Sequence, residues 1–169
     1  MTGTPAWALT LAYWLHMLST VIWIGSLAAV VLLVLPAAQR SLDMPAQIRL
    51  LESLQRRLDP LSWFCLVVLA GTGLFQMSAN PNYLGFLAID NRWAVAILVK
   101  HGLFLLMIAV SAYLTWGVLP QMRRQALRLA RRLEAAETVR WQQWNRRLLQ
   151  INFVLAVVIL ALTALARVS

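Results

Sequence analysis

The sequence contains few of the residues that soluble proteins use for polar chemistry. Of its 169 residues only 12% are charged, two are histidines and one is a cysteine, whereas 61% are hydrophobic. The single Cys65 excludes an intrachain disulfide and any CxxC metal or redox motif. The mean hydropathy of +0.70 falls outside the range of soluble globular domains. These shortages indicate a protein that lies in a lipid bilayer.

Carboxylates are scarce, and we expect them to lie outside the apolar segments. The six acidic residues fall in the connections between those segments: Asp43, Glu52, Asp59, Asp90, Glu134 and Glu137. Paired carboxylates for general acid–base catalysis are therefore not expected within the membrane. The sequence leaves open whether the protein is an enzyme.

Four apolar runs are long enough to span a bilayer, since about 20 helical residues cover its hydrocarbon core. They cover about 7–35, 61–78, 93–119 and 149–166. The first lacks a basic leading segment and is too long for a cleavable signal peptide, so we expect it to remain in the mature protein. The sequence predicts an all-α membrane protein, with residues 1–169 forming one up-down bundle of four transmembrane helices.

The net charge of +9 comes mainly from arginines that gather in the first and third connections. By the positive-inside rule both connections face the cytoplasm, which places both termini in the periplasm or outside the cell. The charge therefore indicates orientation in a bacterial-type inner membrane, and we expect no nucleic-acid partner. Both connections are also predicted to form helical extensions; in the first, Asp43 suits a helix N-cap and Pro45 a first turn.

The two histidines stand at matching places in an internal repeat. The chain reads HMLSTVIWIGSLAAVVLLVLPAAQR from His16 and HGLFLLMIAVSAYLTWGVLPQMRR from His101. A tryptophan precedes each histidine by eight or nine residues, and a VLP proline follows each by 19 or 20. The pattern indicates two helical hairpins in parallel repeat. With Trp7 and Trp93 in the outer aromatic belt, both imidazoles lie roughly 12–14 Å deep.

Two imidazoles at one depth in hydrocarbon are candidates for a functional site, because each ring needs polar partners there. In a four-helix bundle the first and third helices occupy diagonal corners and run parallel, so both rings can face one core. A structural role is the alternative, in which the hydroxyl of Tyr13 or Thr20 satisfies His16.

We favour haem b, ligated by His16 and His101 for electron transfer, because haem iron accepts an imidazole on each face. Gly71, Gly73 and Gly102 lie near the same level and would leave room for the macrocycle. Close helix packing is the alternative explanation for these glycines.

Lys100 and Arg92 lie at and above the histidine level, where they would meet propionates that point outward. For Lys100 the alternative is snorkelling to the outer interface. The loop over residues 78–93 contains turn formers beside aromatic residues, so we expect it to cover the site; a segment lying on lipid is an equal alternative.

Copper is the alternative metal, since it favours histidine together with cysteine or methionine sulfur. Met17, Met77 and Met107 are the nearby candidates, whereas Cys65 is expected well below the histidine level. No MxxM or HxH cluster occurs, so a copper site would have few ligands. A third interpretation is an accessory subunit without a cofactor.

Two segments around the histidines resemble a known family. In WLHMLSTVIWIGSLAAVVLLVLP, Trp23 follows His16 by seven residues and Gly25 comes two residues later. This segment resembles the first helix of the copper resistance D (CopD) family, and ILVKHGLFLLMIAVSAYLTWGVLP is similar to its lysine-bearing helix, with Lys100 at the lysine position. A more distant similarity extends to HemJ-type protoporphyrinogen oxidases, small four-helix proteins associated with haem.

The resemblance implies an integral inner-membrane protein for copper uptake or resistance, with His16 at the family's helix-one histidine. The additional helices and fused periplasmic copper-binding domain of longer members are not found in this sequence, which leaves the haem interpretation open. Oxidation of a porphyrinogen rests on analogy alone. A redox partner, a larger membrane complex and homo-oligomerisation are not decided by the sequence.

Overall fold

The computed structural model describes residues 5–80, 85, 92–122, 124 and 136–168. The elements in these ranges are α1 (Ala6–Ala28), η1 (Ala29–Val34), α2 (Leu35–Ser41), α3 (Met44–Ser78), α4 (Arg92–Ala112), η2 (Tyr113–Val118) and α6 (Ala136–Val168). η1 and η2 are π-helical turns that continue directly from the α-helices before them. The described part of the chain is therefore all-helical, as predicted.

Four helical segments are long and apolar enough to cross a membrane: Ala6–Ser41, Met44–Ser78, Val95–Met122 and Val139–Leu165. They correspond to the four predicted spans, and the expected number is confirmed. Large apolar side chains such as Trp7, Val67 and Trp116 are exposed on their outer faces. Such a surface is consistent with surrounding lipid.

The helix α3 joins the predicted first-connection helix and the second span into one rod of 35 residues. It starts where expected, because the backbone N–H of Ala46 donates to Oδ1 of Asp43 at 3.2 Å and Pro45 occupies the first turn. Pro60, the residue directly before the expected start of the second span at residue 61, lies inside the helix. A proline removes one backbone hydrogen bond of a helix. The helix α3 nevertheless continues through Pro60 to Ser78.

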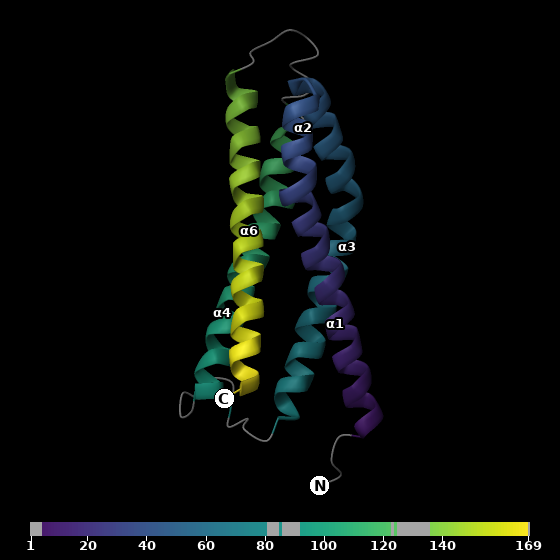
Figure 1. Cartoon of the computed structure of the whole chain (residues 1–169), viewed down its shortest axis with the longest axis vertical. Helices are drawn as coiled ribbons and strands as arrows, with labels where there is room; N and C mark the ends of the chain where they lie inside the picture. The colour runs from purple at the N-terminus through teal and green to yellow at the C-terminus, as the bar shows by residue number, and fades with distance from the viewer. Residues whose placement is uncertain (1–4, 81–84, 86–91, 123, 125–135, 169) are drawn as a thin grey trace.

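The helices pack as two pairs, α1 along α3 and α4 along α6. Figure 1 shows the pairs close together around α2 and farther apart where α1 begins; the start of α1 and the end of α6 lie at this same end. We call this end the histidine half, because it holds His16, Thr72 and His101. The other end is the arginine half, which holds Arg40, Arg56 and Arg146.

The packed core is concentrated in the arginine half. Its larger buried cluster comprises Val30, Val31, Leu35, Ile48, Leu51, Leu114, Val118, Met122, Leu148 and Leu149. A smaller cluster lies nearer the middle of the bundle and comprises Trp23, Cys65, Leu66, Met107 and Ala156. Within the described residues, Met107 is the last buried side chain of α4 met on going toward the histidine half. The histidine half is thus the less densely packed part of the bundle.

The π-helical turns stand at matching positions of the sequence repeat. η1 begins roughly three and a half turns after His16, and η2 begins a similar distance after His101. Each turn precedes the proline of a VLP motif, Pro36 or Pro120. The repeat seen in the sequence therefore has a structural counterpart in both halves of the chain.

Candidate metal site in the histidine half

The ring of His16 is held by a residue of the neighbouring helix. Its Nδ1 lies 2.8 Å from Oγ1 of Thr72 on α3. The sequence had suggested Tyr13 or Thr20 as the partner, but the Thr20 hydroxyl donates to the backbone carbonyl of His16 at 2.7 Å. The depth of the segment 71–73 was predicted correctly, whereas the role of its threonine was missed.

A second hydrogen bond fixes the protonation of the His16 ring. The Thr72 hydroxyl donates its proton to the carbonyl of Val68 at 2.6 Å. It can therefore only accept from Nδ1, so Nδ1 carries the imidazole proton in the neutral ring. Nε2 is left as the nitrogen with the lone pair. Histidines that ligate metals are commonly held in this way through the nitrogen that does not bind the metal.

His101 has the same tautomer for a different reason. Its Nδ1 lies 2.7 Å from the carbonyl oxygen of Ile97, one turn earlier on α4. A carbonyl only accepts, so the neutral ring carries its proton on Nδ1 and its lone pair on Nε2. In the neutral ring both histidines of the protein thus carry their proton on Nδ1.

Lys100 lies directly before His101 on α4 and is half-buried. A lysine cation at this level of the span favours an anionic group nearby over a further positive charge.

The three candidate glycines differ in their surroundings. A side chain on Gly73 would meet Cε1 of the His16 ring at 3.5 Å, so Gly73 packs directly against that ring. Gly71 and Gly102 are exposed and would meet nothing within 4 Å. Only Gly73 is thus in contact with the candidate site. The side chain of Arg92 and most of the loop expected to cover the site lie outside the described residues.

Sulfur ligands lie one level deeper in the bundle. Cys65 and Met107 belong to the same buried cluster, with 1% and 2% of their surfaces exposed. Cys65 comes about 10 Å along α3 from Thr72, and Met107 about 9 Å along α4 from His101. Within the described residues no group of three or more His, Cys, Asp or Glu converges on one point. A soft metal would therefore meet few ligands at a time, distributed along the axis.

The second, third and fourth spans match a known protein family. A family model described as Copper resistance protein D, CopD, matches residues 52–166. The match includes Thr72, Lys100 and His101 and begins after α1, which carries His16. Neither a curated protein nor a solved structure matches the chain.

Proposed function

Because the chain belongs to the CopD family, we propose that it is a copper-handling protein of the inner membrane that takes a copper ion as its cargo. The hydrogen bond between Nδ1 of His16 and Oγ1 of Thr72 is the observation that carries this proposal, because it leaves the lone pair of the neutral ring on Nε2. It provides a nitrogen ligand within a span, and the sulfurs of Cys65 and Met107 follow deeper in the bundle. Nitrogen and soft sulfur donors together favour copper, and thiolate or thioether favours Cu(I) in particular.

The order of the ligands suggests a route for the ion. It would bind first to His16, with His101 as the second nitrogen donor, and pass to the sulfur level at the middle of the bundle. Cu(I) accepts few ligands, so transfer between sparse sites does not need a preformed cage. With the arginine half on the cytoplasmic side, this route runs inward from the outer face.

Competition with the Cu(I) chelator bicinchoninate tests the proposal on protein purified in detergent. We expect His16→Ala to weaken Cu(I) affinity by at least about tenfold, the lower range seen even when only a supporting residue of a metal ligand is lost. The double variant Cys65→Ala/Met107→Leu should remove binding at the deeper level. Met17→Leu is the matched control, because Met17 adjoins His16 but is 63% exposed. Equal Cu(I) affinity in all four proteins would refute the proposal.

Haem b is a second candidate, favoured by the half-buried Lys100 directly before His101. The two histidines have the tautomer that haem ligation needs, and Lys100 would attract a propionate. His16 and His101 would hold the iron, and the haem would supply one-electron transfer. Oxidised and dithionite-reduced spectra separate the candidates: α and β bands lost in both His16→Ala and His101→Ala support haem, whereas a colourless protein with stoichiometric copper supports the first proposal.

A further inference from the structure

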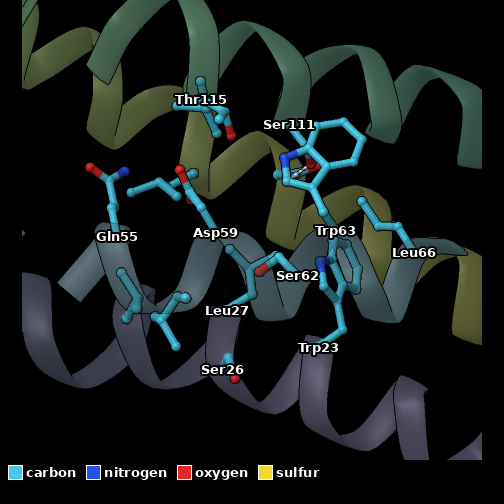
Figure 2. Close-up of a pocket in the computed structure, with 15 residues that line it drawn as sticks. Trp23, Ser26, Leu27, Gln55, Asp59, Ser62, Trp63, Leu66, Ser111 and Thr115 are labelled. Carbon is cyan, nitrogen blue, oxygen red and sulfur yellow. Dashed lines mark hydrogen bonds between the residues drawn. The ribbon is translucent and has the colours of Figure 1, made fainter. Parts of the chain in front are cut away.

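A cavity of about 70 Å³, with polar side chains set in a largely apolar wall, lies in the arginine half, away from the histidines. Figure 2 shows Gln55, Asp59 and Ser62 of α3 facing Ser111 and Thr115 of the α4–η2 segment across this space. The indole of Trp23 and the side chain of Leu27 contribute apolar wall. The cavity is thus a largely apolar space lined by several side-chain oxygens, between helices that also carry the lipid-facing surface.

Asp59 gives the cavity its charge. The sequence placed this carboxylate in the first connection, which forms the first part of α3; the structure adds that the residue is half-buried and lines the cavity. Thr115 of η2 lines the same cavity opposite Asp59 (Figure 2). Among the residues that line the cavity in the described part of the chain, Asp59 is the single charged one. A partly buried carboxylate with no positive side chain among the residues that line the cavity favours a cation there.

Two further acceptors in the cavity wall have no donor. Asn152 is 97% buried; its Nδ2 donates to Oγ of Ser111 at 2.9 Å, but its Oδ1 has no hydrogen-bond partner. Oε1 of Gln55, a residue that is 8% exposed, also has none. Buried oxygens of this kind are rare and call for a ligand or bound water. Both residues line the same cavity as Asp59.

The two π-helical turns border this cavity. Val30 comes from η1, and Leu114 and Thr115 come from η2. A π-helical turn inserts an extra residue into a helix and shifts the side chains that follow it, and such turns occur often at functional sites. Both repeat-related turns thus contribute residues to the wall of this cavity.

We propose that this cavity is a binding site for a monovalent hard cation such as Na⁺. Asp59 supplies one negative charge, and the carbonyl oxygens of Gln55 and Asn152 with the hydroxyls of Ser62 and Ser111 supply neutral ligands. One carboxylate balances one positive charge, whereas Ca²⁺ sites usually contain several. The donors are all oxygen, so the site does not suit Cu(I), which prefers sulfur. The proposal goes beyond copper handling and does not depend on it.

Equilibrium binding of ²²Na⁺ to the full chain in detergent tests the proposal, with choline chloride keeping the ionic strength constant. We expect saturable binding to the wild-type protein, and affinity weakened by about tenfold or more in Asp59→Asn, which removes the charge but keeps the shape. Glu52→Gln is the matched control, since it removes a carboxylate of the same helix that lies outside the cavity, and it should bind as the wild type does.

A second variant guards against loss of the fold. Asn152→Leu removes an unpaired buried oxygen and replaces the side chain with an apolar one of similar size, so it should fold and elute as the wild-type protein while binding ²²Na⁺ more weakly. A wild-type protein without saturable ²²Na⁺ binding would show that the cavity holds water alone and would overturn the proposal. Unchanged affinity in both Asp59→Asn and Asn152→Leu would also overturn it.

Discussion

His16 and Thr72 lie 56 positions apart in the chain and are joined by one hydrogen bond of 2.8 Å, whose direction is set by the bond from Thr72 to Val68. The pair links α1 to α3 and selects the imidazole nitrogen that keeps its lone pair. The residue that decides the chemistry of His16 is therefore on a different helix. It lies within the segment that matches the CopD family, although His16 itself does not.

Removal of the Thr72 hydroxyl should weaken copper binding without removing a ligand. In Thr72→Val the His16 ring loses its acceptor and is free to change tautomer or turn, so we expect Cu(I) affinity to fall by about 10–100-fold. Chelator competition measures this loss. Thr20→Val is the control, because the Thr20 hydroxyl contacts only the backbone carbonyl of His16. Similar losses in both variants would mean that Thr72 does not orient the ring.

Substitutions at Gly73 should depend on side-chain size. A Cβ at this position would make ordinary contact with Cε1 of His16 at 3.5 Å, so Gly73→Ala should keep Cu(I) binding close to wild type. In Gly73→Val a methyl group would enter the space of the ring, and a valine in a helix has little rotamer freedom to avoid it. We expect this variant to bind Cu(I) at least about tenfold more weakly.

Position 71 provides the comparison for this experiment. Gly71→Val carries the same change in propensity and volume two residues away, where a side chain meets nothing within 4 Å. Its Cu(I) affinity should equal that of the wild type. If Gly71→Val and Gly73→Val lose affinity equally, a general effect on α3 explains the result better than contact with the ring.

The four helices were predictable because each depends on a local property of the sequence. Apolar runs of sufficient length specify the spans, and Asp43 with Pro45 specifies the start of α3. The level of one helix residue relative to another was also predictable, since the rise of a helix is constant. For this reason the levels of His16 and of residues 71–73 agreed with the structure.

Features that depend on helix rotation and pairing were not predictable. Whether Asp59 faces a cavity or solvent depends on how α3 is rotated against its neighbours. Pro60 is typical of a helix boundary, but α3 continues through it. Thr72 was passed over because its hydroxyl becomes informative only when α1 lies beside α3. The π-helical turns have no composition signal of their own, although the repeated VLP motif marks their position.

A buried amide pair in the arginine half should cost stability rather than supply it. Nε2 of Gln55 lies 3.4 Å from Oδ1 of Asn145, a long hydrogen bond, and Oε1 of Gln55 and Nδ2 of Asn145 have no partner. In Asn145→Leu alone, Nε2 of Gln55 loses its acceptor, which we expect to cost about 1–3 kcal/mol. The double variant Gln55→Leu/Asn145→Leu should be more stable than that single variant, because no polar group is left unpaired.

Thermal unfolding in detergent with choline chloride measures these stabilities without a cation for the cavity. Asn145→Leu should lower the midpoint relative to the wild-type protein, and the double variant should reverse that loss. A double variant less stable than Asn145→Leu would show that the two amides contribute more than their geometry suggests. Gln55 also lines the cavity that contains Asp59. A destabilising amide pair at this place is consistent with a functional need for polar side chains in the cavity.

Orientation in the membrane is tested by cysteine labelling at one position in each half of the bundle. Ser41 ends α2 in the arginine half, Ser78 ends α3 in the histidine half, and both are exposed. Since arginines near a span are retained on the cytoplasmic side, an impermeant maleimide added to intact spheroplasts should label Ser78→Cys and leave Ser41→Cys unlabelled. Inverted membrane vesicles should give the opposite pattern.

The native Cys65, 1% exposed, should stay unlabelled in both preparations until the protein is denatured, so it reports membrane and protein integrity in the same sample. Labelling of Ser41→Cys from outside would reverse the orientation and with it the direction proposed for copper.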